Sequence, residues 1–222
     1  MSQSRTLRLA HRGDWRVAPE NTLAAFRAAL DHPGCDGLEL DVRLSADGVP
    51  VVCHDPTLER TRGLPERVDA VSAERLGHLE VPTLAEVLAL VGRRAFLDVE
   101  LKVDGSPALV EVLAAGRGPE LHNAVVSSFE PTALDSVAHK APAWPRWLNT
   151  VALDAGAVTA ATSLGCRGIS AEWHSLDSGT VSLATAAGLT VAAWTVRRRA
   201  TFERLAGLGV AAICVEAAAL DG

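Results

Sequence analysis

The sequence predicts an α/β protein built as a closed (β/α)8 barrel, and three observations support this fold class. Short apolar runs alternate with longer amphipathic stretches, which is the pattern of a parallel sheet whose strands are connected by helices. No Gly-rich phosphate loop follows an early strand, as the rival architecture, a doubly wound open sheet, would require. The chain has 222 residues, 48% of them hydrophobic, which is enough to bury the core of one barrel-sized domain.

The expected strands and helices follow one another in nearly strict alternation. Strands are expected at 7–10, 37–42, 49–53, 95–101, 124–128, 147–151, 167–171, 190–196 and 211–215. Helices are expected at 21–30, 84–91, 108–115, 131–138, 155–164, 179–187 and 200–208. The nine strand-like runs are one more than a closed eight-stranded barrel needs.

A hairpin accounts for the extra strand. Too few residues separate the second and third runs for a crossover helix, and Asp47-Gly48 between them is a strong hairpin signal. If these two residues form the loop, paired positions sum to 95 and Asp41 lies opposite His54. We therefore expect the second barrel strand to extend into a hairpin arm, which leaves eight strands for the barrel.

The segment after the hairpin predicts a small insertion near the rim of the barrel. Residues Asp55 to Pro82 lack strong periodicity and carry many charges. No linker or internal repeat divides the rest of the chain. We expect a single domain over residues 1–222, with the insertion at about 55–82.

Composition and charge argue against several classes of function. The net charge of −6 at pH 7 argues against nucleic acid as a partner, because that partner demands a clustered basic surface. No apolar run approaches the roughly 20 residues that span a membrane, and the segment Met1–Arg8 has no signal-peptide pattern. The four widely spaced cysteines favour free thiols. We expect a cytoplasmic protein without a stable membrane anchor; its oligomeric state is not readable from the sequence.

Three carboxylates at the ends of expected strands predict a cation site. Glu39 and Asp41 lie two apart on one strand and therefore share a face, and Glu100 lies on a later strand. The carboxyl ends of barrel strands converge at one rim, where these groups would repel unless a cation or a shared proton neutralises them. Oxygen ligands suit a hard cation, so we expect one divalent cation, Mg²⁺ or Ca²⁺, rather than a purely structural network.

Two histidines that follow strands predict acid–base chemistry. His11 and His54 each begin a polar cluster, and imidazole titrates near neutral pH, so the pair can serve as general base and general acid. Arg12 and Lys102 would supply fixed positive charge for a phosphate. His174, which follows a strand-like run, is a weaker candidate for lining the same pocket. Together these groups predict hydrolysis of a phosphate ester.

A series of motifs carries a family resemblance. The strings HRGDWRVAPENTLAAF, GLELDVRLSADGVPVVCHDPTLERT, DVELK, VVSSF and AAWTV occur in this order between residue 9 and about residue 196. In kind and order they resemble the motifs of the glycerophosphodiester phosphodiesterase family, and the ordered set is highly specific. The resemblance implies a TIM barrel that hydrolyses small-molecule glycerophosphodiesters to glycerol 3-phosphate and an alcohol, with Ca²⁺ or Mg²⁺ as cofactor.

The resemblance also implies roles for the catalytic and metal-binding residues. His11 and His54 match the family's catalytic pair, while Glu39, Asp41 and Glu100 match its metal ligands. One histidine would activate either water or the glycerol 2-hydroxyl, the latter through a cyclic phosphate, and the other would protonate the departing alcohol. The sequence leaves open which histidine is the acid and which route is taken.

Five further positions match residues around the substrate. Arg12 matches the family's phosphate-binding arginine, Lys102 the lysine that helps hold the phosphate, and Trp194 an aromatic wall of the pocket. Glu20 and Asn21, in the PENT string, are expected to brace the site from behind.

Two positions depart from the family pattern. Arg197 follows W-T-V, where members commonly carry Asn. The string Cys214-Val215-Glu216-Ala217 stands where members often have one like TDRP. Both departures bear on substrate choice and on the end of the last strand.

Two alternative functions remain. A phospholipase D-like enzyme acting on lysophospholipids or sphingolipids would need an exposed apolar rim, and segment 55–82 offers no clear one. A non-catalytic phosphate-ligand binding protein would be favoured by loss of His11, His54 or a metal carboxylate, and all of these are present.

Overall fold

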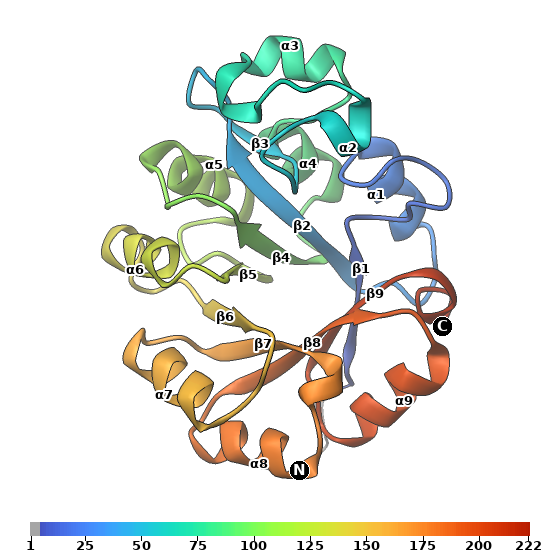
Figure 1. The fold of residues 1–222 in the computed structure, drawn as a ribbon, viewed down its shortest axis with the longest axis vertical. Coiled ribbons are helices and arrows are strands. Elements are labelled where there is room, and N and C mark those ends of the chain that lie inside the picture. The colour runs from blue at the N-terminus through green and yellow to red at the C-terminus, as the bar shows by residue number, and fades with distance from the viewer. Residues whose placement is uncertain (1–4) are drawn as a thin grey trace.

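Eight parallel strands close into a barrel in the computed structural model, which describes residues 5–222 (Figure 1). The first strand pairs with both the second and the last, and this closes the sheet. The barrel strands are β1 (Leu7–His11), β2 (Gly37–Leu44), β4 (Phe96–Leu101), β5 (Ala124–Ser128), β6 (Arg146–Thr150), β7 (Gly168–Glu172), β8 (Thr190–Val196) and β9 (Ala212–Val215). The expected (β/α)8 barrel is confirmed. Residues 1–4, part of the segment in which no signal peptide is expected, lie outside the described residues.

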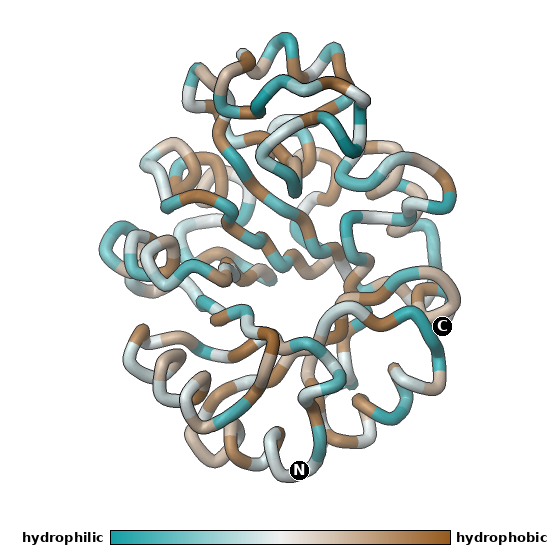
Figure 2. The backbone as a smooth tube through the Cα atoms, in the orientation of Figure 1, coloured by the Kyte–Doolittle hydropathy of each residue, from teal (hydrophilic) through white to brown (hydrophobic). Residues whose placement is uncertain are grey.

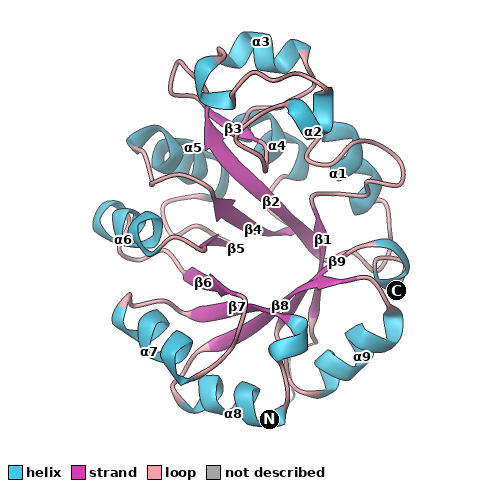
Figure 3. Ribbon diagram, viewed as in Figure 1, coloured by secondary structure: helices cyan, strands magenta, loops and turns pink. Residues whose placement is uncertain are grey.

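Helices between the strands form the outer layer (Figure 3). They are α1 (Leu23–Leu30), α4 (Leu84–Val91), α5 (Pro107–Arg117), α6 (Pro131–Lys140), α7 (Ala155–Ser163), α8 (Ser178–Ala186) and α9 (Arg199–Gly207). Five begin after a Ser, Thr or Asp whose side chain accepts a hydrogen bond from a first-turn amide, as at Thr22 before α1. No helix within residues 5–222 is long and apolar enough to cross a membrane.

The core has an inner and an outer part. The larger apolar cluster lies between the sheet and the helices. A smaller one fills the barrel interior and contains Leu9, Val125, Trp147, Ala192, Ala212 and Cys214. Side chains two apart on a strand share a face. The residues two positions after members of this cluster therefore also point into the barrel interior, one layer closer to the carboxyl ends of the strands. Those residues include His11, Ser127, Asn149 and Trp194, and the alternation therefore places a largely polar layer next to the apolar cluster.

The hairpin arm forms, but its predicted register is wrong by one residue. Strand β3 (Pro50–Val52) pairs antiparallel with β2, and the paired positions sum to 94, as in Arg43 opposite Val51. Asp41 therefore lies opposite Cys53, whose amide donates to its carbonyl over 2.9 Å, and not opposite His54. The loop has three residues, 46–48, and closes with Gly48 at φ +77°. Three-residue loops favour such a left-handed glycine, and the sequence signal did not distinguish them from two-residue loops.

The insertion after the hairpin forms a small subdomain at the top of Figure 1. It contains α2 (Glu59–Arg62), the 3-10 turn η1 (Val68–Ala70) and α3 (Ala73–His78). Hydrophilic residues make up much of its backbone trace (Figure 2), yet it has an apolar cluster of its own. The cluster comprises Val51, Cys53, Leu58, Val68, Val71, Leu76 and Val81. The hairpin arm contributes two of these residues and thereby anchors the insertion to the barrel.

Candidate active site

A cavity of about 210 Å³ lies at the carboxyl ends of the barrel strands. Seven of the ten predicted site residues line it, and Asp41, Asn21 and Glu20 contact those residues from behind. Its lining residues are His11, Arg12, Glu39, His54, Asp98, Glu100, Lys102, Ser127, Phe129, Asn149, Ser170, Trp194, Thr195 and Cys214. The sequence-predicted residues are therefore brought together in one place.

The three predicted carboxylates form a compact buried cluster. One oxygen from each of Glu39, Asp41 and Glu100 lies within 4.8 Å of the others. Burial, followed by the Asp41 and Glu100 charges, raises the pKa of Glu39 well above its usual value. Both Glu39 oxygens are buried and accept no hydrogen bond within residues 5–222. Orphaned carboxylate oxygens at this spacing fit the oxygen ligands that a hard divalent cation requires.

Fixed positive charges compensate part of the cluster. Lys102 Nζ lies 3.1 Å from Asp41 Oδ1 and also pairs with Glu100. Arg12 Nε lies 3.1 Å from Asp41 Oδ2, to which Asn21 Nδ2 donates over 2.9 Å. Although burial opposes it, Arg12 and then Lys102 hold the pKa of Asp41 below its usual value. Asp41 is thus ionised, while Glu39 has no Lys or Arg partner within residues 5–222 and is therefore the carboxylate best placed to take a cation.

His11 is held by a carboxylate that sequence reasoning did not assign to the site. Its Nδ1 lies 2.6 Å from Glu216 Oε1, and its Nε2 lies 3.8 Å from Glu39 Oε2. Arg197 Nε donates to the other Glu216 oxygen over 2.7 Å. The His11 and Arg197 contacts outweigh burial and lower the pKa of Glu216 to about 2. Because Glu216 is ionised at neutral pH, Nδ1 carries a hydrogen and Nε2 faces the carboxylate cluster.

His54 has the same kind of support. Its Nδ1 lies 2.6 Å from Asp55 Oδ1, and Arg60 Nε donates to the other Asp55 oxygen over 2.6 Å. Arg60 also bonds to Glu20 at 2.7 and 2.8 Å, and Glu20 accepts from Arg12 Nη1 at 3.0 Å. Burial lowers the pKa of His54, which is therefore neutral at pH 7. Each histidine is thus fixed by a carboxylate that an arginine holds in turn.

The loop after β1 adopts a left-handed backbone that brings these groups together. Arg12 has φ +60° and Asn21 has φ +58°, values that non-glycine residues rarely adopt. The Arg12 amide donates to the Glu39 carbonyl, and the Asn21 amide donates to the Arg12 carbonyl. Gly13 between them has φ +86°, and a Cβ there would lie 2.7 Å from the Ala25 backbone. The loop thereby turns Arg12 and Asn21 together towards Asp41.

The cavity floor contains polar residues that were not singled out from the sequence as site residues. Burial raises the pKa of Asp98 to about 7, and the Ser127 hydroxyl donates to it over 2.6 Å. Asn149 leaves its buried Oδ1 without a hydrogen bond within the described chain. Asp98 precedes Glu100 by two residues, so the i, i+2 rule that placed Glu39 and Asp41 on one face could have found it. No comparable signal identified Asn149.

Trp194, the aromatic residue expected at the pocket, lines the cavity. Its indole N–H donates to the Ser170 carbonyl over 3.1 Å, and its ring meets Phe129 edge-to-face at 5.4 Å. His174, the weaker candidate, does not line this cavity. It lies in an adjoining groove, paired with Glu172 at 2.6 Å.

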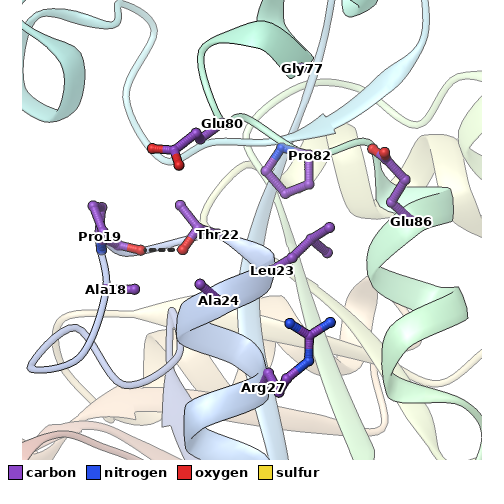
Figure 4. Close-up of a pocket in the computed structure, with 10 residues that line it drawn as sticks. All are labelled: Ala18, Pro19, Thr22, Leu23, Ala24, Arg27, Gly77, Glu80, Pro82 and Glu86. Atoms are coloured by element: carbon purple, nitrogen blue, oxygen red, sulfur yellow. Dashed lines mark hydrogen bonds between the residues drawn. The ribbon is translucent and has the colours of Figure 1, made fainter.

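A second cavity lies between α1 and the insertion and contains none of the ten predicted site residues (Figure 4). Apolar side chains such as Leu23 line much of it, together with Arg27 and two acidic residues. One of the acids, Glu86, already accepts hydrogen bonds from the amide and hydroxyl of Thr83 as a helix cap. The chemistry-bearing residues therefore lie in the barrel cavity.

Residues 11–220 match the model of the glycerophosphoryl diester phosphodiesterase family. Among curated relatives, the glycerophosphodiester phosphodiesterase of Caldanaerobacter subterraneus is 36% identical over 62% of this chain and 64% of its own length. Glycerophosphodiester phosphodiesterase 1 of Mus musculus is 32% identical over 60% of this chain and 45% of its own. The matches thus span roughly half to two thirds of these relatives' lengths.

Solved structures match over nearly the whole chain. A phosphodiesterase of Oleispira antarctica, solved in complex with the product sn-glycerol-3-phosphate, has a TM-score of 0.84 and 29% identity. The match covers 95% of this chain and 93% of that one. A glycerophosphodiester phosphodiesterase of Agrobacterium tumefaciens has a TM-score of 0.83 and 28% identity, with coverage of 97% and 98%.

Proposed function

Because this chain belongs to the glycerophosphoryl diester phosphodiesterase family, we propose that it hydrolyses glycerophosphodiesters to glycerol 3-phosphate and an alcohol. The observation that carries the proposal is one cavity lined by two carboxylate-fixed histidines and by Glu39 and Glu100 of the buried carboxylate cluster. The structural relative from Oleispira, with its glycerol 3-phosphate product, supports the substrate class.

We assign the residues as follows. Glu39, Asp41 and Glu100 hold one Mg²⁺ or Ca²⁺, which when bound would stabilise negative charge on the phosphate oxygens. Arg12 and Lys102 bind the phosphate, and the Trp194 ring bounds the substrate pocket.

The histidine pair supplies the proton transfers. His11 and His54 have their Nδ1 atoms bound to carboxylates, which leaves each Nε2 to take or give a proton. One histidine, unprotonated at Nε2, accepts a proton from the attacking water or glycerol 2-hydroxyl, and the other, protonated at Nε2, donates a proton to the leaving alkoxide. On the 2-hydroxyl route, water then opens the cyclic phosphate in a second step. Glu20 and Asn21 keep Arg12 and Asp41 in place through their hydrogen bonds.

A direct assay tests the proposal. Purified protein with Mg²⁺ or Ca²⁺ should release glycerol 3-phosphate from glycerophosphoethanolamine, and EDTA should stop the release. Readdition of each metal separately then reports which cation is used. Absence of product with both metals, over a panel of alcohol head groups, would reject the proposed activity.

One observation favours a second candidate substrate, an acylated phosphodiester such as a lysophospholipid. Phe129 and Val151 are 39% and 67% exposed, and both line an open groove with Leu148 and Asn149. Phe129 and Asn149 also line the catalytic cavity, so this groove adjoins it. An acyl chain needs an exposed apolar surface of this kind beside the catalytic cavity in order to bind. Comparing the turnover rates of glycerophosphocholine and lysophosphatidylcholine distinguishes the two candidate substrate classes. Faster turnover of lysophosphatidylcholine, the acylated compound, would favour the second candidate.

A further inference from the structure

A second groove adjoins the catalytic cavity on the side of β7, β8 and α9. It has a volume of about 390 Å³ and shares Thr195 with the catalytic cavity. Its lining residues are Trp173, His174, Thr195, Arg197, Arg198 and Thr201. The shared residue places the groove directly beside the cavity, on a side towards which the alcohol of a bound phosphodiester could extend.

The groove is cationic although the chain as a whole is acidic, with a net charge of −6. Arg197 and Arg198 line it, and none of its lining residues is a carboxylate. Arg198 is exposed and has no ion-pair partner within the described part of the chain. Two nearby acids pair with groove residues, Glu172 with His174 and Glu216 with Arg197, so within residues 5–222 Arg198 carries the charge that they do not compensate. Positive charge without an internal counterion attracts an anionic group from outside.

Arg197 connects this groove to the catalytic histidine. Only its Nε is bonded to Glu216, while 71% of its side chain remains exposed. The same Glu216 holds His11 through its other oxygen. Arg197 is one departure from the family pattern, Glu216 lies within the other, the string Cys214-Val215-Glu216-Ala217, and here the two residues contact each other. An anion bound beside Arg197 is therefore two short hydrogen bonds away from the His11 ring.

We infer that this groove is a head-group subsite selecting substrates whose alcohol carries an additional anion, a carboxylate or a phosphate. The inference rests on the proposed phosphodiesterase function. Arginine suits both anions because its guanidinium forms paired hydrogen bonds with either. The Trp173–His174 pair, with ring centroids 3.5 Å apart and ring planes at 30°, forms an aromatic wall for the remainder of the alcohol.

A matched pair of substrates tests the subsite. Glycerophosphoserine and glycerophosphoethanolamine differ by one carboxylate, so the ratio of their kcat/KM values isolates its contribution. The wild-type protein should prefer glycerophosphoserine, and Arg198→Glu should lower the ratio on the order of tenfold, because it replaces attraction by repulsion. The preference should also weaken between low salt and 0.5 M salt, since exposed charges are screened. Arg198 is chosen over Arg197 because changing Arg197 would also disturb Glu216.

Arg94→Glu is the control for the change in net charge. Arg94 is exposed and lies in the turn before β4, at the end of the barrel opposite the rim, so its variant should keep the wild-type ratio. An unchanged ratio in Arg198→Glu, with both substrates cleaved, would refute the subsite and leave the phosphodiesterase function intact. Cleavage of neither substrate by the wild-type protein would instead refute the proposed function. A phosphate-bearing alcohol as a third substrate reports which anion is preferred.

Discussion

Replacement of Glu216 by Gln tests the support of His11, because it removes one charge and preserves the side-chain shape. Glu216 is 7% exposed and bonds to His11 at 2.6 Å and to Arg197 at 2.7 Å. Its pKa falls from 4.5 to about 2 in the folded protein. At about 1.36 kcal/mol per pKa unit, this difference corresponds to roughly 3 kcal/mol of stability for the ionised form. Glu216→Gln should therefore lower the free energy of unfolding by about that amount at pH 7.

The sign of the pH dependence follows from the lowered pKa of Glu216. A carboxyl whose pKa is lower in the folded than in the unfolded protein contributes its full stabilisation at pH values above the unfolded-state pKa, here near 4.5. This contribution is lost as the pH falls towards the folded-state pKa, about 2. The stability difference between wild type and Glu216→Gln should thus shrink from pH 5 to pH 2. Urea unfolding of both metal-free proteins across this range measures it. Other buried acids titrate in both proteins and cancel in the difference.

The same variant should also lose activity. Glu216 does not line the cavity, so KM should stay within about threefold, while kcat should fall roughly 10- to 100-fold because His11 loses its orienting partner. Glu203→Gln is the matched control, since Glu203 is 62% exposed and within residues 5–222 pairs only with Arg199; its effect should stay below about 0.5 kcal/mol. If Glu216→Gln matched this control in stability and kept kcat within twofold, the reasoning would be wrong.

Three further predictions concern the catalytic cavity. His11→Ala and His54→Ala should each lower kcat by roughly 10²-fold or more in a steady-state assay, and full activity in both would remove the pair from the mechanism. Glu39→Gln should lower affinity for the divalent cation at least about tenfold by titration calorimetry, whereas unchanged binding would exclude Glu39 as a ligand. The same variant should raise the thermal midpoint of the metal-free protein, because burial and the Asp41 and Glu100 charges disfavour an ionised Glu39; a lowered midpoint would contradict that explanation.

The sequence was sufficient to predict the fold class and most of the candidate site. Alternation of apolar runs and helical patterns fixed the order of the elements, because each period follows from local backbone geometry. The i, i+2 spacing of Glu39 and Asp41 placed both on one inward face, and barrel closure brings strand ends together whatever lies between them.

Other features depended on details that periodicity does not determine. The hairpin register depended on whether the loop has two or three residues, and the sequence signal is the same for both. Asp98 escaped attention although it shares the face of Glu100. Its raised pKa, about 7, depends on burial, which only the closed barrel sets.

The supports of the two histidines were decided by tertiary structure alone. Glu216 reaches His11 across 205 sequence positions because the last strand closes against the first. Arg60 reaches Glu20 because the insertion folds over the loop after β1. Such partners depend on where separate loops meet in space, and local patterns carry no information about that. The sequence thus determined which residues can carry out the chemistry, and the tertiary structure decided which charges hold them in place.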